Sequence, residues 1–410
     1  MKKLFALLLS LAMVLALVAC GQKDPTPDTP DTPDDPQTKV EYKVAMITDY
    51  GDITDQSFNQ TTYEACKAFA EDNSIEFSYF KPAGDNTADR VAMIEKAVDE
   101  GFNVIVMPGY AFGGAIVEAA PEFPDVKFIA LDVAAGDLLE TAVAKAGEAY
   151  DYTPENWDLN KYVDMSNVYC AVYQEELCGY MAGYAAVKLG YKNLGFLGGM
   201  SVPAVVRYGY GFVQGVDAAA ADLGLTDVKL NYIYGGQFFG DADITAVMDT
   251  WYQGGTEVVF ACGGGIYTSA VDAAKKVGAK VIGVDVDQAG VIAKYAGVDG
   301  MTVTSAMKGL YPATYDTLTD VIVNGNWDKY VGKIATLGLV SGTDPEANYV
   351  QIPMGDGTQW SDSFTQDDYK AMVKDMFDGK ITVSNNTSSD VSAADFATVI
   401  TVDDQGSIKG

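Results

Sequence analysis

The sequence predicts an α/β fold in which two doubly wound parallel sheets, one in each of two lobes, flank a ligand cleft at the hinge. Three observations predict it. Short apolar runs alternate with segments of helical spacing, which is the pattern of βαβ units in a parallel sheet. The 42 glycines among 410 residues fit many tight turns between strands and helices. The alternation stops over residues 135–166 and then restarts, so we expect two halves of the same kind.

The first twenty residues precede this fold and are typical of a secretory leader. The leader has lysines at positions 2 and 3, and an apolar run over residues 4–17 follows. That run is too short and wrongly flanked for a membrane-spanning helix. It ends in the residues LVAC, which resemble a bacterial lipobox, so we expect a signal peptide over residues 1–19 and lipidation of Cys20. The alternative is a plain signal peptide cut after Ala19, with a cysteine that has no role.

Residues 20–38 are predicted to be a disordered tether. The stretch 24–37 (DPTPDTPDTPDDPQ) combines prolines with acidic and polar residues and has no large apolar side chain. Such a composition buries too little surface to fold, and its prolines favour an extended spacer. We therefore expect the folded part of the chain to lie on the extracytoplasmic face of the cell membrane, anchored there by lipid.

In the first half, strands and helices follow one another from residue 42. The predicted strands are the apolar runs at residues 43–48, 104–107 and 127–131 and the alternating segment at residues 75–80. The predicted helices have apolar residues at helical spacing, at residues 57–72 and 89–100. Residues 135–166 are mostly acidic, and we expect them to be irregular.

The second half repeats the pattern. Its predicted strands are residues 168–173, 193–197, 228–234, 258–261 and 281–284. Its predicted helices are residues 175–189, 205–223, 241–252 and 267–277. A further strand at 301–304 and helix at 311–322 suit a chain that returns across the hinge, and 383–410 is expected to be an edge strand and tail. We therefore assign residues 39–165 and 305–327 to lobe 1, and residues 166–304 and 328–410 to lobe 2.

Composition excludes several classes of function. Lys and Arg number 27 against 57 Asp and Glu, which gives 27 − 57 = −30 and repels nucleic acid. The chain has no histidine, which removes Ser-His-Asp and Cys-His catalysis and histidine-based metal sites. Carboxylate pairs and Ser-Lys chemistry remain open in principle. We expect a protein that is not an enzyme and that needs neither a metal nor a cofactor.

The cysteines give no support to a zinc or redox motif. Besides Cys20 they are Cys66, Cys170, Cys178 and Cys262, and no CxxC occurs. Buried thiols are the preferred interpretation. A bond between Cys170 and Cys178 stays open.

Polar and aromatic residues gather in the turns after predicted strands, where ligands bind in open α/β sheets. The first turn, residues 49–60, holds Asp49, Asp55, Phe58 and Asn59. An aromatic ring beside amide and carboxylate groups suits a flat, hydroxylated ligand. The alternative is a capped helix with a core phenylalanine.

Other strand ends carry similar residues. Phe238 lies in the turn 235–241, and two such turns from different lobes can close on a planar ring from both sides. Asp285 ends a strand, where a carboxylate can accept hydrogen bonds from two sugar hydroxyls. Lys308 and Asp132 also end strands, with a surface cation and a helix cap as the alternatives. The glycine-rich turns match neither GxGxxG nor a P-loop, so phosphate binding finds weak support.

Together these segments resemble the basic membrane protein family of substrate-binding lipoproteins, the purine nucleoside receptor A-like group. The resemblance is carried by segments spread in order over roughly residues 40–325. They are residues 51–60 (GDITDQSFNQ), 197–203 (LGGMSVP), 210–212 (YGF), 236–238 (GQF), 282–288 (IGVDVDQ) and 304–309 (TSAMKG). The resemblance implies a type I periplasmic-binding-protein fold that delivers a nucleoside to an ABC importer.

The resemblance also implies roles for single residues. Phe58 and Phe238 would be the ring partners of the base, and Asp285 and Lys308 would hold the ribose hydroxyls. The candidates for polar contacts to base or ribose are Asp49, Asp55, Asn59 and Asp132.

By this resemblance, the expected partners are a nucleoside of the purine type and the permease subunits of an ABC transporter, and the receptor is expected to be a monomer. The same fold binding riboflavin, a sugar or a signalling ligand is the alternative, because stacking between two rings suits a flavin as well as a purine.

Overall fold

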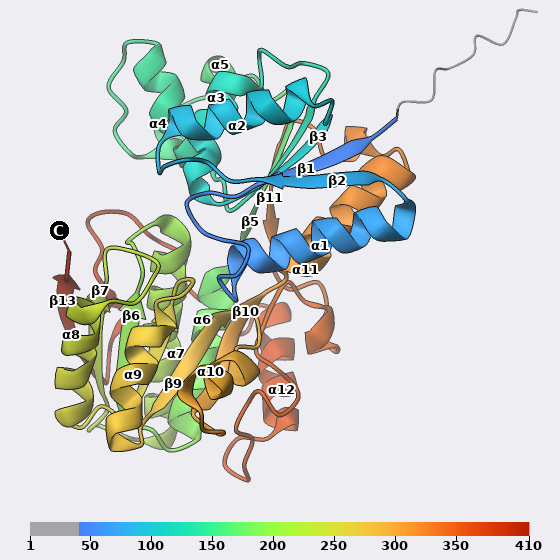
Figure 1. Cartoon of the computed structure of the whole chain (residues 1–410). Helices are drawn as coiled ribbons and strands as arrows, with labels where there is room; N and C mark the ends of the chain where they lie inside the picture. The colour runs from blue at the N-terminus through green and yellow to red at the C-terminus, as the bar shows by residue number, and fades with distance from the viewer. Residues whose placement is uncertain (1–40, 410) are drawn as a thin grey trace, which may run out of the picture. The chain divides into compact units, whose positions relative to one another are not determined.

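The computed structural model describes residues 41–409, and within that range the strands form two sheets flanked by helices (Figure 1). The predicted leader over 1–19, the lipidated Cys20 and the tether over 20–38 lie outside the described residues. In residues 41–409, no helix has the length and apolar character needed to span a membrane.

The first sheet is parallel throughout, and the part of the molecule built on it is called the first lobe below. Its strands in spatial order are β11 (Lys333–Leu337), β5 (Val168–Tyr173), β4 (Lys127–Leu131), β3 (Val104–Pro108), β1 (Lys43–Ile47) and β2 (Glu76–Phe80). Its helices are α1 (Phe58–Asn73), α2 (Thr87–Asp99), α3 (Gly113–Ala119), α4 (Ala135–Lys145), α5 (Leu159–Tyr162) and α11 (Leu310–Leu318), with α11 packed on α1.

The second sheet is parallel except at one edge, and the part built on it is the second lobe. Its strands in spatial order are β12 (Val350–Gln351), β10 (Thr302–Lys308), β9 (Lys280–Asp285), β8 (Val258–Cys262), β6 (Asn193–Gly198), β7 (Lys229–Tyr234) and β13 (Thr401–Ser407). Only β12, against β10, is antiparallel among these described strands. Its helices are α6 (Glu175–Lys188), α7 (Pro203–Leu223), α8 (Ala242–Gln253), α9 (Tyr267–Val277), α10 (Ala289–Ala296) and α12 (Gln366–Phe377).

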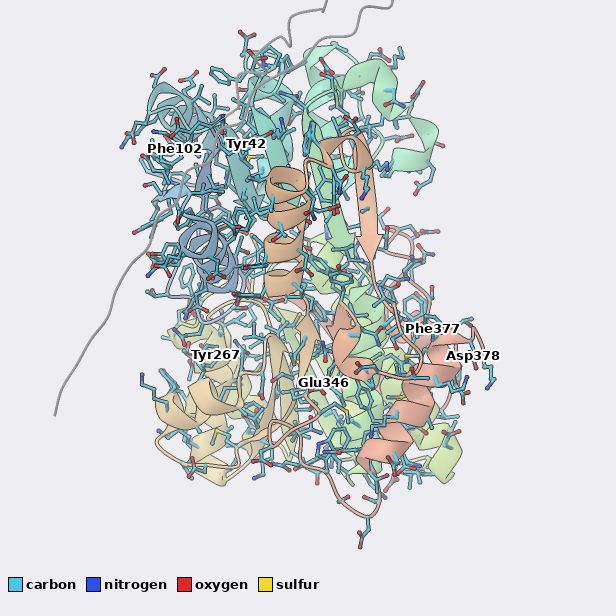
Figure 2. The ribbon with its side chains drawn as sticks, turned by 90° about the vertical axis from the view of Figure 1, so that its right-hand side faces the viewer. Tyr42, Phe102, Tyr267, Glu346, Phe377 and Asp378 are labelled. Atoms are coloured by element: carbon cyan, nitrogen blue, oxygen red, sulfur yellow. The ribbon has the colours of Figure 1, made fainter. Side chains whose placement is uncertain are left out.

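Helices cover both faces of each sheet, which explains why the strands read as continuous apolar runs. In β1, Ala45 and Ile47 enter the core on one face, while Val44 and Met46 enter the core on the other. A strand that is buried on both faces has apolar residues at successive positions, so its sequence shows no alternation of apolar and polar residues. Figure 2 shows the side chains of both lobes, with Tyr42 and Phe102 in the first and Tyr267 and Phe377 in the second.

The lobe boundaries differ from those expected from the sequence. Strand β5 pairs with β4 in the first sheet, although residues from 166 on were assigned to lobe 2. Strand β11 pairs with β5 in the same sheet, although 328–410 was assigned to lobe 2, and β10 keeps residues 305–308 in the second sheet. An apolar strand pattern shows that a strand is buried but does not show which sheet it joins.

Residues 135–166 are also more regular than expected, because α4 occupies 135–145. Its sequence is rich in Ala, Leu and Glu, which are good helix formers. Asp137 lies in the first turn and its carboxylate accepts a hydrogen bond from the Ala134 N–H at 2.7 Å. The acidic residue that suggested an irregular segment is therefore the start signal of a helix.

The chain passes between the lobes after β5, after β10 and after β11, and backbone hydrogen bonds join these crossing segments. The Gln174 N–H donates to the Leu337 carbonyl at 2.9 Å, and the Gly309 N–H donates to the Tyr349 carbonyl at 2.7 Å. The crossing segments therefore lie side by side as a hinge. After β10 the chain returns to the first lobe in α11 and β11, and it leaves that lobe again after β11.

The cysteines of the described residues are free and buried. Cys66, Cys170, Cys178 and Cys262 form no disulfide there, so the bond left open between Cys170 and Cys178 is absent. Burial raises the pKa of each thiol, which leaves them as small apolar core groups.

The second lobe depends on a close crossing of α6 and α7 that only glycine allows. A Cβ atom on Gly179 or Gly183 of α6 would lie 2.3 Å from a carbonyl oxygen of α7. A Cβ atom on Gly211 or Gly215 of α7 would lie 2.1 Å from a carbonyl oxygen of α6. The two helix backbones therefore touch along this line.

We expect Gly183→Ala to lower the free energy of unfolding by about 1–3 kcal/mol, the usual cost of overpacking a core. The matched control is Gly290→Ala in α10, where no atom lies within 4 Å of the added Cβ. That change should be neutral or stabilising, because alanine favours helix more than glycine does. Urea unfolding of both variants tests this, and equal stabilities would contradict the tight crossing.

Candidate functional site

The candidate site lies where the order of strands reverses in each sheet. In the first sheet the chain reverses between β1 and β3, and in the second between β6 and β8. Ligands of open α/β sheets bind beyond the carboxyl ends of strands at such points. Turns after these strands line a cavity of about 510 Å³ between the lobes. This volume is in the range of small-molecule sites.

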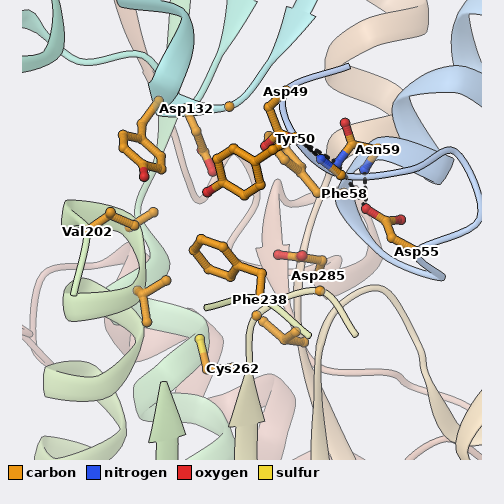
Figure 3. A pocket seen from close by; sticks show the side chains of 18 of the residues that line it. Asp49, Tyr50, Asp55, Phe58, Asn59, Asp132, Val202, Phe238, Cys262 and Asp285 are labelled. Atoms are coloured by element: carbon orange, nitrogen blue, oxygen red, sulfur yellow. Dashed lines mark hydrogen bonds between the residues drawn. The ribbon is translucent and has the colours of Figure 1, made fainter. Parts of the chain in front are cut away.

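Two aromatic rings face each other across the cavity (Figure 3). The Tyr50 ring of the first lobe is stacked on the Phe238 ring of the second, with centroids 6.0 Å apart and planes inclined by 19°. The Phe238 ring lies against Gly199 and Gly263, where an added Cβ would come within 2.4 and 2.6 Å of a ring atom. The absence of side chains at those two glycines makes room for this ring.

The partner of Phe238 differs from the one that the sequence suggested. Phe58 lines the cavity, but the ring stacked on Phe238 in this structure belongs to Tyr50. The Lys308 ammonium instead lies 4.8 Å from the centre of the Phe58 ring, a cation–π contact. Tyr50 follows Asp49 directly after a strand, and an aromatic residue at that point was the signal that could have found it.

Asp55 shapes the loop before α1. Its carboxylate accepts hydrogen bonds from the backbone N–H groups of Ser57 at 2.9 Å, Asn59 at 2.9 Å and Gln60 at 3.1 Å. It also accepts from the Asn59 side-chain amide at 3.1 Å. The helix-cap alternative for this carboxylate therefore holds in the structure, and what Asp55 does for the site is to orient Asn59.

Asp49 is buried beside the same amide. Its Oδ1 accepts from the Gly51 N–H at 2.6 Å and from Asn59 Nδ2 at 3.2 Å. Burial outweighs these hydrogen bonds and raises the pKa of Asp49 to about 6. Because both partners of the Asn59 amide group are carboxylates, the nitrogen of that amide must face them.

Lys308 brings carboxylates of both lobes together. Its Nζ lies 2.5 Å from Asp132 of the first lobe, and 3.5 Å from Glu175 and 3.7 Å from Asp285 of the second. Burial alone would lower the Lys308 pKa, but these carboxylates outweigh it and raise the pKa, so the ammonium stays charged. Sequence reasoning found Lys308, Asp132 and Asp285 but missed Glu175, which begins a helix and resembles an ordinary first-turn acid.

Two of these aspartates share an unusual backbone. Asp132 and Asp285 end β4 and β9, one in each sheet, and both have positive φ angles of 59° and 66°. Aspartate tolerates this conformation better than most residues, though still at some cost. This backbone conformation turns each carboxylate back toward the cavity. Asp285 also accepts hydrogen bonds from the Ser57 hydroxyl across the cleft and from the Tyr208 hydroxyl at 3.3 Å.

The cavity carries an excess of negative charge. Its lining cations are Lys308 and Arg207, and Arg207 Nε is paired with Glu175 at 2.7 Å. Its lining carboxylates are those of Asp49, Asp52, Asp55, Asp85, Asp132, Asp137 and Asp285. Within the described part of the chain, no cluster of acidic or cysteine side chains is arranged to hold a metal ion. The arrangement favours a neutral ligand that donates hydrogen bonds and has a flat ring.

Comparisons with known proteins identify the family. The model of the family described as "ABC transporter substrate-binding protein PnrA-like" matches residues 42–345. The "ABC transporter nucleoside-binding protein BmpA" of Lactococcus lactis subsp. cremoris is 25% identical over 92% of this chain and 96% of its own length. An uncharacterised lipoprotein of Pyrococcus abyssi is 26% identical over 74% of this chain and 69% of its own.

A solved structure supports the fold. It is a solute-binding protein of an ABC transporter system from Aeropyrum pernix, with a TM-score of 0.59 and 20% identity. The alignment covers 84% of this chain and 88% of that one. The periplasmic-binding-protein type of fold expected from the sequence is thereby confirmed.

The buried carboxyl groups predict a pH dependence of stability. Burial raises the pKa of Asp137 to about 7, that of Glu176 to about 7 and that of Asp49 to about 6. The folded protein therefore binds more protons than the unfolded chain between about pH 4 and pH 7, so its stability rises as the pH falls through that window. We expect the free energy of unfolding to be higher at pH 5 than at pH 7.5 by at least about 1 kcal/mol.

Chemical denaturation of the purified chain at the two pH values measures this difference. Asp137→Asn should reduce it. Asp164→Asn is the control, because the Ser166 N–H lowers the pKa of Asp164 and that group titrates below the window. A protein that is less stable at pH 5 than at pH 7.5 would contradict the prediction.

Proposed function

The chain belongs to the family of PnrA-like substrate-binding proteins of ABC transporters, and from this premise we propose that it captures a nucleoside, preferentially a purine nucleoside, for an importer. The family role is binding and delivery rather than catalysis. The observation that carries the proposal is the stacked pair of Tyr50 and Phe238 beside the carboxylates around Lys308. A nucleoside has both a flat ring and adjacent hydroxyl groups.

The distance between the two rings is close to the distance that a base between them would need. A planar ring held between two others needs about 7 Å, twice a carbon contact distance of about 3.5 Å. The Tyr50 and Phe238 centroids are 6.0 Å apart, so the rings must separate by about 1 Å to admit a base. These rings belong to different lobes, and a small opening about the hinge supplies that motion.

The polar groups divide between the two parts of the ligand. Asp285 and Lys308 are proposed to hold the ribose hydroxyls, with Asp132 beside them. Asp49 and Asn59 lie by Tyr50 and are proposed to read the edge of the base (Figure 3). Asp55 supports them by fixing Asn59.

The anchor and the partner complete the proposal. Lipidation of Cys20 would hold the receptor, as a monomer, at the extracytoplasmic face of the membrane, and two acyl chains give a stable anchor where one gives a marginal one. The leader sequence and the relative named a lipoprotein support this. The permease of an ABC transporter would recognise the lobes closed on the ligand.

A thermal-shift panel tests the proposal. A ligand that binds only the folded protein raises the melting temperature by mass action. Adenosine, guanosine or inosine should raise it, and ribose alone should not. Guanosine 5′-monophosphate should bind at least about tenfold more weakly than guanosine, because its phosphate meets the acidic cavity. A response to riboflavin or a sugar with none to nucleosides would move the ligand to the alternative class.

Substitution of the rings tests the stacking directly. Phe238→Ala and Tyr50→Ala should each weaken nucleoside binding by about 1–3 kcal/mol, the range for a base stacked on an aromatic side chain. Titration calorimetry measures the loss. Phe377→Ala is the control, because Phe377 is half-exposed at the end of α12, outside the cavity lining (Figure 2). A loss with Phe58→Ala but not with Tyr50→Ala would instead support the pairing suggested by the sequence.

A further inference from the structure

The C-terminal segment of the chain ends beside the turn that carries Phe238. Strand β13 lies parallel to β7 at the edge of the second sheet (Figure 1). The Ile408 N–H continues the pairing by donating to the Tyr234 carbonyl at 2.8 Å. Residues 346–410 lie beyond the part of the chain that the family model matches. The second sheet is therefore extended at this edge by a strand that runs toward the cavity.

Lys409 contacts the turn between β7 and α8 at several points. Its Nζ donates a hydrogen bond to Gln237 Oε1 at 2.8 Å and forms an ion pair with Asp241. Gly236, with a φ of 78°, lies directly against it. A Cβ on Gly236 would come within 2.7 Å of both the Cβ and the carbonyl oxygen of Lys409. Lys409 thus touches both ends of the segment that holds Phe238.

The turn needs such a support because it is glycine-rich. Residues 235, 236 and 240 are glycines, which leave a backbone with wide conformational freedom. Three hydrogen bonds that do not involve Lys409 also hold the turn: the Gly236 N–H donates to the Gly199 carbonyl at 2.9 Å, the Gly265 N–H donates to the Phe238 carbonyl at 2.9 Å, and the Asp241 N–H donates to the Ser269 hydroxyl at 3.0 Å. On the outer side, Lys409 contacts the turn through its side chain and its backbone.

The segment is itself fixed by contacts that do not involve Lys409. The Asp217 carboxylate accepts hydrogen bonds from the backbone N–H groups of Thr398, Val399 and Ile400 at 2.8–3.2 Å. The Trp251 indole N–H donates to the Gln405 side chain at 3.2 Å. Removal of the Lys409 side chain should therefore leave β13 in place.

We propose that Lys409 is a positioning residue for the ligand: it holds the turn of residues 235–241 so that the Phe238 ring stays parallel to Tyr50. The effect of Lys409 on ligand binding rests on the proposed function, whereas its effect on the turn does not. Lys409 belongs to the second lobe and moves with the turn, so it maintains one wall of the cavity in both the open and the closed cleft.

The first test measures the turn without any ligand. In Lys409→Ala, the Gly236 and Asp241 amides should exchange with deuterium about 3- to 10-fold faster, because the partly buried ion pair and its hydrogen bond are lost. The control is Lys276→Ala, which removes a comparable ion pair with Asp249 on α8 of the same lobe. The Asp249 and Asp241 side chains are similarly exposed, at 26% and 27%. Unchanged exchange at both amides in Lys409→Ala would overturn the proposal.

The second test measures the ligand. Guanosine should bind Lys409→Ala about 3- to 10-fold more weakly than the wild type, while Lys276→Ala should bind as the wild type does. Lys409→Arg should restore most of the affinity, since a guanidinium can also pair with Asp241. Faster exchange with unchanged affinity would overturn the link to the ligand. If the wild type binds no nucleoside, the proposed function fails, and the exchange rates still decide the effect of Lys409 on the turn.

Discussion

The site depends on a buried cation that carboxylates from both lobes surround. Lys308 is 6% exposed, and a lone ammonium so placed would be costly. The carboxylates of Asp132, Glu175 and Asp285 offset that cost. The backbone conformation orients the carboxylates of Asp132 and Asp285, and an ion pair with Arg207 holds that of Glu175. The positive φ angles of Asp132 and Asp285 follow from this arrangement, because each strand must end with its carboxylate turned toward one point.

The position of the three carboxylates also explains how the cleft can open. Glu175 and Asp285 belong to the same lobe as Lys308, so they stay with it when the lobes separate. Asp132 belongs to the other lobe and would become hydrated on opening. The charge of Lys308 is therefore compensated in both states, and only one of its ion pairs is exchanged for water. A ligand with hydroxyl groups at this place adds hydrogen bonds that favour the closed state.

Much of the fold could be predicted from the sequence, because parallel strands that are buried on both faces appear in the sequence as apolar runs. Strands β1, β3, β4 and β8, whose residues are nearly all buried, illustrate this. Helix α9 was predicted with its bounds, Tyr267–Val277. Sheet membership could not be predicted, since β5 and β11 have the same apolar character as strands of either lobe. The site residues at strand ends could be predicted because an apolar run also shows where its strand ends. Glu175 and Arg207 were missed, because their roles arise from contacts between segments far apart in the chain. Tyr50 was missed although its place in the turn after a strand was a local signal.

Central strands and strands at the sheet edge contribute differently to the cavity. Two of the carboxylates around Lys308, those of Asp132 and Asp285, lie at the ends of central strands, where the backbone is fixed by neighbours on both sides. Phe238 follows β7, which without β13 would be the edge strand of its sheet. A ring carried after an edge strand is placed less rigidly, because half of the backbone groups of that strand lack partners. The addition of β13 gives β7 a neighbour and brings Lys409 to the turn. The aromatic wall of the second lobe is thus supported by a strand at the sheet edge, whereas Asp132 and Asp285 are held at the ends of central strands, so different parts of the fold hold the ring and the ion pairs.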